Sequence, residues 1–99
     1  MREVVEELVD ADRLGPGEAL RLRTREAGDH FRPLNGPGER KLKEFFIDRK
    51  VPRQHRDRTL LLARGKEILW VVGVGLSDEV KVRPETVRLL RLRAEPLTG

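Results

Sequence analysis

The sequence predicts an α+β domain, in which one main helix at about residues 39–50 packs on a small antiparallel or mixed sheet or a β-sandwich-like core. Three observations support this fold class. Several segments alternate apolar and charged residues with period two, two nearly continuous apolar runs flank a short turn, and one long segment carries apolar residues at helical spacing. A chain of 99 residues without cysteine forms one domain and excludes disulfides and thiolate ligands.

Residues 1–19 are predicted to form an acidic extension or a short helix ahead of the main domain. Val4, Val5 and Leu8 share one helical face within residues 2–9, and glutamates occupy the other positions. We therefore expect a helix at residues 2–9.

Residues 20–25 alternate leucine or threonine with arginine, which predicts a half-buried strand with an arginine row facing solvent. Three like charges along one strand face repel one another. The row either faces phosphates or pairs with acids on neighbouring strands. Residues 27–38 are rich in glycine and proline and read as a loop, with Phe31 as its anchor.

The main helix is predicted from Leu42, Phe45 and Phe46, which lie at positions i, i+3 and i+4 and so share one face. These side chains are expected in the core. Pro52 makes a continuous helix past Lys50 unfavourable, because the residue before proline avoids the α region.

The second half of the chain is predicted to be mainly strands. Residues 59–63 and 67–72 form a hairpin around a turn at residues 64–66, and both faces of these apolar strands should be covered. Residues 79–83 alternate again and predict a short strand. The last segment, residues 87–93, favours a strand over a helix.

The chain offers little chemistry of its own. His30 and His55 are too few for a metal site and are interpreted as surface or loop histidines. The segment from Gly73 to Asp78 lacks the third glycine and the following helix of a dinucleotide loop, and it is interpreted as a bend. We expect no metal, no cofactor and no independent enzyme in this chain.

The charge is uneven. Residues 1–19 carry a net charge of −4, residues 20–99 carry +8, and residues 40–58 alone hold eight Lys or Arg against three acids. A nucleic acid is the partner this favours over a membrane, although a heat-stable protein with ion-pair networks has a similar composition. The longest apolar run, nine residues, is too short to span a bilayer, and no signal peptide is evident, so we expect a cytoplasmic protein.

One family matches these motifs. The segment GDHFRPL at residues 28–34, the segment KLKEFFIDRKVPR at residues 41–53, and the apolar strands after them resemble the C-terminal domain of bacterial tRNA(Ile)-lysidine synthetase. The resemblance runs over residues 20–93, leaving residues 94–99 as a tail. The sequence departs from the family pattern at Asn35, where glycine is expected.

The resemblance implies a tRNA-binding accessory domain. The family's domain is also similar to a β-sandwich-like module of the phenylalanyl-tRNA synthetase β subunit. In the family, a separate catalytic domain uses ATP and Mg²⁺ to attach lysine to the wobble cytidine of an isoleucine tRNA. That catalytic domain is expected to be missing here and to be a partner, and this domain is expected to hold the tRNA at its acceptor stem.

The expected RNA contacts are basic side chains that reach backbone phosphates, because the four aromatic residues lie in core patterns. They are Arg32, Lys41, Lys43, Arg49, Lys50, Arg53, Arg56 and Arg58. The alternative is a module without RNA affinity, whose basic face docks on an acidic surface or forms a dimer.

Overall fold

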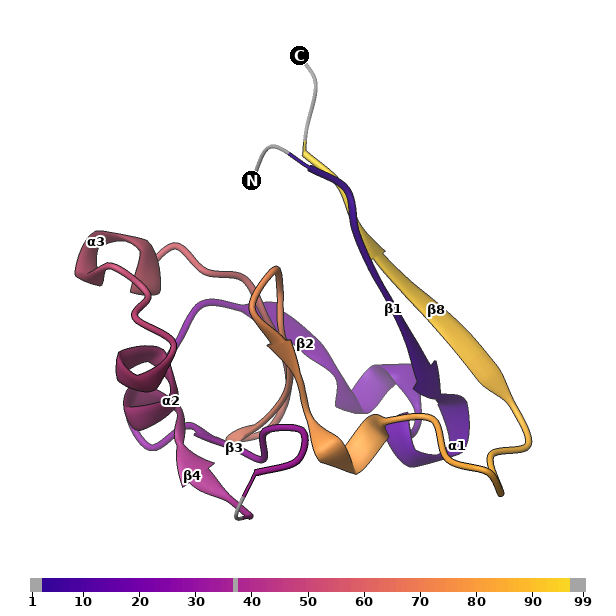
Figure 1. Cartoon of the computed structure of the whole chain (residues 1–99). Helices are drawn as coiled ribbons and strands as arrows, with labels where there is room; N and C mark the ends of the chain where they lie inside the picture. The colour runs from indigo at the N-terminus through magenta and orange to yellow at the C-terminus, as the bar shows by residue number, and fades with distance from the viewer. Residues whose placement is uncertain (1–2, 37, 97–99) are drawn as a thin grey trace.

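The chain folds around one mixed sheet with helices on either side, beside a separate two-stranded ribbon (Figure 1). The computed structural model describes residues 3–36 and 38–96. The sheet has the strand order β2-β5-β6-β3-β4, with β7 also paired to β6, and β3 runs parallel to β6. Its strands are β2 (Arg21–Arg23), β3 (His30–Phe31), β4 (Arg40–Lys41), β5 (Leu61–Arg64), β6 (Glu67–Val71) and β7 (Gly75–Leu76).

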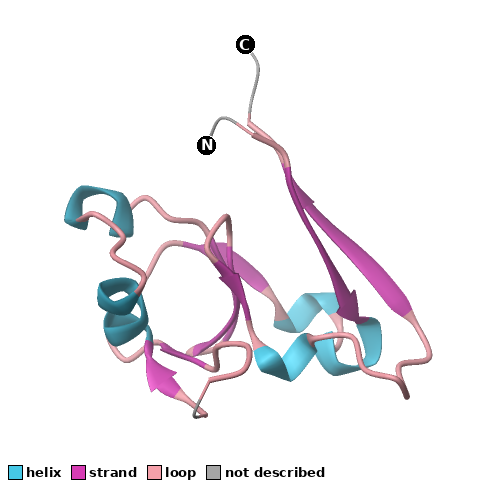
Figure 2. Ribbon diagram, in the orientation of Figure 1, coloured by secondary structure: helices cyan, strands magenta, loops and turns pink. Residues whose placement is uncertain are grey.

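The other elements are a two-stranded ribbon and several short helices (Figure 2). The ribbon pairs β1 (Val5–Asp10) with β8 (Leu89–Ala94). The helices are α1 (Ala11–Leu14), α2 (Leu42–Asp48) and α3 (Arg53–Arg56), and two 3₁₀ turns are η1 (Gly17–Ala19) and η2 (Asp78–Val80). This mixed sheet with one main helix confirms the predicted α+β class.

The predicted hairpin of β5 and β6 forms the centre of the molecule, and both of its faces are covered. One apolar cluster packs Leu61 and Ile68 against α2 and β3, and the other packs Leu69 and Trp70 against α1, η2 and β1. The pairing register of β5 with β6 shifts by one residue between Leu62 and Ala63. This bulge lets neighbouring Leu69 and Trp70 enter the same cluster, which strict alternation would forbid.

Helix α2 is anchored as the sequence predicts, because Leu42, Phe45 and Phe46 are all buried. It is shorter than residues 39–50, since Arg40 and Lys41 belong to β4. At its end, the Val51 N–H donates to Phe46 O and the Lys50 N–H donates to Ile47 O, while Lys50 has φ 55°. This pair of hydrogen bonds is a Schellman motif, which reverses the chain ahead of α3.

The helix predicted for residues 2–9 is wrong over its described part, which forms strand β1. Pairing with β8 runs from Val5 opposite Ala94 to Asp10 opposite Leu89. Val9 is fully buried in the core as a result. Long-range strand pairing thus overrides the local helical pattern.

The strand predicted at residues 20–25 exists as the shorter β2, and its arginine row faces solvent only at Arg21, because Arg23 and Arg25 are partly buried. Leu22 is 63% exposed at the sheet edge, whereas the side chain of Arg23 is only 14% exposed. The register pairs Arg23 with Leu61, whose side chain lies in the α2 cluster. The arginines of β2 therefore belong to the face that carries α2.

Two further segments differ from expectation. The predicted strand at residues 79–83 is wrong, because its first two residues belong to the 3₁₀ turn η2. The Ser77 hydroxyl caps η2 by accepting from the Glu79 N–H at 3.1 Å. His30 lies in β3, not in a loop. The predicted strand at residues 87–93 is confirmed as β8, and Phe31 is fully buried as its role of anchor requires.

The glycines near the core show why the chain bends where it does. Gly75 starts β7, and a Cβ there would lie 3.1 Å from the Phe45 ring, so the predicted bend lets the chain pack directly on α2. Asn35 has φ 56°, the left-handed region that glycine adopts most easily and asparagine tolerates. This conformation explains why glycine is expected at that position.

Candidate nucleic-acid interface

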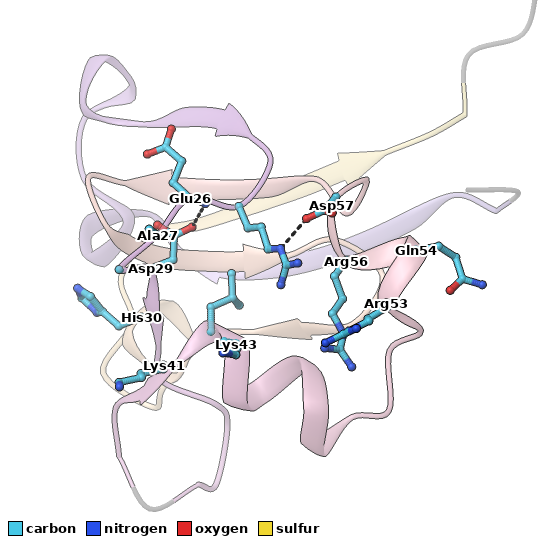
Figure 3. A pocket seen from close by; sticks show the side chains of 13 residues that line it. Glu26, Ala27, Asp29, His30, Lys41, Lys43, Arg53, Gln54, Arg56 and Asp57 are labelled. Atoms are coloured by element: carbon cyan, nitrogen blue, oxygen red, sulfur yellow. Dashed lines mark hydrogen bonds and ion pairs between the residues drawn. The ribbon is translucent and has the colours of Figure 1, made fainter.

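An open groove of about 1090 Å³ separates the end of β2 and the following loop from helices α2 and α3 (Figure 3). Its walls carry five Lys or Arg and three acids. The charged lining residues are Arg25, Glu26, Asp29, Lys41, Lys43, Arg53, Arg56 and Asp57. The uncharged residues Ala27, Gly28, His30, Leu42 and Gln54 complete the lining.

Two local structures bring the basic residues of α2 and α3 to the same groove. The Leu42 N–H donates to Asp29 O at 3.0 Å, which fixes the start of α2 against the loop before β3. Pro52 precedes α3 with φ −57°, so the chain turns back after α2. Lys41 and Lys43 on one side therefore share the groove with Arg53 and Arg56 on the other (Figure 3).

Asp29 and Arg23 form the structural support of the groove. The Asp29 carboxylate accepts from both terminal nitrogens of Arg23, at 2.8 and 2.9 Å, and from the Glu26 N–H at 2.8 Å. Burial raises the pKa of Asp29, but these hydrogen bonds and the positive charge of Arg23 outweigh it and hold the pKa below its ordinary value. The pair fixes the loop that forms one wall.

Stability should fall in acid because three carboxyl groups share such a lowered pKa. The Thr86 hydroxyl lowers the pKa of Asp10, the Lys81 ammonium lowers that of Asp78, and Asp29 is held as above. A carboxyl group whose pKa is lower in the folded than in the unfolded chain stabilises the fold at pH values above its unfolded pKa of about 4. This stabilisation is lost as the pH falls through the pKa of the folded state. Urea unfolding should thus give a lower free energy at pH 3 than at pH 7.

The variant Asp29→Asn provides the control for this pH dependence. It removes one of the three titrating groups, so the difference in unfolding free energy between pH 7 and pH 3 should shrink. An unchanged difference would show that Asp29 does not contribute to the acid sensitivity.

Four cations in the groove lack an acidic partner among residues 3–36 and 38–96. They are Lys41, Lys43, Arg53 and Arg56. The acids of the groove are already occupied, since Asp29 binds Arg23, Glu26 binds Lys66, and Asp57 binds Arg25. These four positive charges are therefore available to an anionic ligand.

Most described arginines outside the groove form ion pairs with carboxylates. Such a network is the alternative that the charged composition also allows. These arginines contact carboxylates within the fold, and they are Arg13, Arg23, Arg32, Arg40, Arg64, Arg83, Arg88, Arg91 and Arg93. Among the described arginines outside the groove, Arg21, Arg49 and Arg58 also have no carboxylate partner, but they do not share one groove.

The structure separates the eight basic residues predicted to contact RNA. Four of them line the groove, as described above. Arg32 contacts Glu79 at 3.3 Å, Arg49 donates to Val74 O and lies over the Phe45 ring, and Lys50 forms the turn after α2. Arg58 lies in a smaller hollow next to Leu60. RNA contact by any of the eight stays a prediction.

One basic groove residue, Arg25, was missing from that prediction. It lies past the end of β2, and its Nε donates to Asp57 Oδ1 at 2.7 Å. Only the alternation of residues 20–25 pointed to it, and that pattern left open whether its partner is a phosphate or an acid.

The described residues show neither a cluster of metal ligands nor a helix able to span a membrane. In residues 3–36 and 38–96, no three His, Cys, Asp or Glu side chains gather in a way that could hold a metal ion. Over the same ranges, none of the helices has the length and hydrophobicity needed to cross a membrane.

Comparison with known proteins gives one consistent family. The family model described as "TilS substrate C-terminal domain" matches residues 20–93. The tRNA(Ile)-lysidine synthase of Caldanaerobacter subterraneus subsp. tengcongensis is 52% identical over 69 residues, covering 70% of this chain and 15% of that protein. The tRNA(Ile)-lysidine synthase of Dehalococcoides mccartyi is 45% identical over 84 residues, covering 85% of this chain and 17% of that protein.

A solved structure agrees with these sequences. The "Crystal structure of TILS C-terminal domain" superposes with a TM-score of 0.69 at 31% identity, covering 95% of this chain and 72% of that one. The chain spans only 15–17% of the length of the two curated relatives named above.

Proposed function

Because this chain belongs to the family of TilS substrate C-terminal domains, we propose that it binds tRNA through the basic groove. In this proposal the chain is the tRNA-holding part of a tRNA(Ile)-lysidine synthase, the name its relatives carry. The ligation of lysine to the wobble cytidine, with ATP and Mg²⁺, is then the work of a separate catalytic domain. The tRNA contact is at the acceptor stem.

The observation that carries this proposal is the set of unpaired cations in the groove. Lys41, Lys43, Arg53 and Arg56 converge there, while most other arginines in the described chain contact carboxylates. Like charges held close together at a surface without counter-ions repel one another, and a phosphate backbone relieves this repulsion. A bound polyanion should therefore be more favourable in this groove than solvent alone.

The proposed mode of binding is contact with the phosphate backbone of a stem. Single-strand RNA binders stack bases on exposed aromatic side chains. Here all four aromatic residues are at most 4% exposed: Phe31, Phe45, Phe46 and Trp70. The structure supports duplex recognition through charge and shape instead of base stacking.

Binding should depend strongly on salt if this proposal is correct. Each neutralised phosphate contributes a slope of about −0.7 to −0.9 to the log–log plot of affinity against salt concentration, so four contacts give about −3. Fluorescence anisotropy with a tRNA transcript between 50 and 200 mM KCl measures this slope.

Two outcomes would end the proposal. One is the absence of tRNA binding at low salt, and the other is binding with no salt dependence. Sedimentation of the chain with and without tRNA distinguishes this proposal from the docking or dimerisation alternative. That alternative requires either self-association of the chain or a sedimentation coefficient that tRNA does not change.

A further inference from the structure

Arg25 is held in the groove on two sides. Its Nε donates to the Asp57 carboxylate at 2.7 Å, the dashed contact at Asp57 in Figure 3. Its guanidinium carbon lies 5.9 Å from the centre of the Phe46 ring, within cation–π range. Phe46 is itself fully buried, so Arg25 packs on a side chain of the core.

The two terminal nitrogens of Arg25 are left open by this arrangement. Neither Nη1 nor Nη2 donates a hydrogen bond to any residue within 3–36 or 38–96, whereas both terminal nitrogens of Arg23 are bound. The side chain is 31% exposed and lines the groove with Lys43 and Arg53. An arginine fork with two open donors fits a phosphate bidentately.

Asp57 is an unusual residue for a polyanion-binding groove. Its side chain is 74% exposed, and an exposed ion pair contributes little to stability. A carboxylate facing the groove also repels phosphate. The contact of Asp57 with Nε can favour RNA binding only by orienting the guanidinium group of Arg25.

From these contacts we infer that Arg25 binds a backbone phosphate of the tRNA through Nη1 and Nη2, and that Asp57 is the positioning residue that holds its Nε. This inference rests on the proposed function and adds a contact from the segment after β2, which precedes the basic helices in the sequence. The groove is then closed by cations from both walls, with Arg25 facing α2 and α3.

Arg25→Ala should raise the tRNA Kd about tenfold, the loss typical of a hydrogen-bonded charged contact. The matched control is Arg21→Ala, which removes the same charge from an exposed residue of β2 outside the groove and should change Kd less than about twofold. Arg25→Lys keeps the charge but loses the fork, so it should recover little of the affinity.

The role of Asp57 is tested by two variants with the same charge. Asp57→Asn keeps an oxygen that accepts from Nε and removes the repulsion, so its Kd should equal or fall below that of the wild type. Asp57→Ala removes the acceptor as well, and its Kd should be about threefold above that of Asp57→Asn. Thermal unfolding of each variant identifies any loss of fold.

The outcomes separate this inference from the proposed function. A wild-type chain that does not bind tRNA at low salt defeats both. Wild-type binding with equal effects of Arg25→Ala and Arg21→Ala, or full rescue by Arg25→Lys, overturns the phosphate contact alone. Equal Kd values for Asp57→Ala and Asp57→Asn overturn the positioning role of Asp57.

Discussion

Reversing the charges of Lys41 and Arg53 together is expected to weaken tRNA binding at least about a hundredfold. Each side chain is predicted to make one charge-assisted phosphate contact, and a reversal replaces that contact with repulsion. Both residues are exposed, and neither side chain donates a hydrogen bond to, or contacts an acid of, the described part of the chain. The double variant Lys41→Glu/Arg53→Glu should therefore fold normally while its Kd for a tRNA transcript rises.

The control for this variant changes the net charge equally at other places. Arg21 and Arg91 are exposed, and neither lines the groove. Arg21→Glu/Arg91→Glu should weaken binding less than about tenfold, because only the long-range field changes. Comparable losses in the two double variants would mean that net charge, and not the groove, determines affinity.

Asp29→Ala is expected to destabilise the fold by about 3 kcal/mol. The substitution leaves Arg23 largely buried without its carboxylate and leaves the Glu26 N–H without an acceptor. Removing one partner of a buried pair costs about 3–5 kcal/mol, and the partial exposure of Arg23 favours the low end. Urea unfolding at pH 7 measures the change.

Asp57→Ala is the matched comparison, since Asp57 also lines the groove and also contacts one arginine. Its side chain is 74% exposed, against 2% for Asp29. Solvent already screens this pair, so the loss should be below about 1 kcal/mol. Similar losses for the two variants would contradict the structural role assigned to Asp29.

The parts of the fold that sequence predicts correctly are those whose signals are local. The β5–β6 hairpin follows from two apolar runs joined by a short turn, and α2 follows from Leu42, Phe45 and Phe46. The error at residues 2–9 has the opposite origin. β1 is a strand because it pairs with β8 at the other end of the chain, and no local pattern records that partner.

In the candidate site, too, local sequence predicts some features and tertiary structure decides the others. The basic stretch predicts a cluster of cations, but it cannot predict which of them share a groove, because the Schellman turn at Lys50 sets the direction of α3. That turn brings Arg53 toward Lys41 and leaves Arg58 in a different hollow. Arg25 lies just after β2, and only the tertiary structure places it opposite the helices.

The most direct test of the groove as the tRNA-binding site is an NMR titration of the ¹⁵N-labelled chain with an acceptor-stem hairpin. Binding in the groove should give the largest amide shifts at residues 25–30, 41–43 and 53–57, with little change at residues 89–94 of the ribbon. Shifts concentrated on the β1–β8 ribbon, with the groove unaffected, would contradict it.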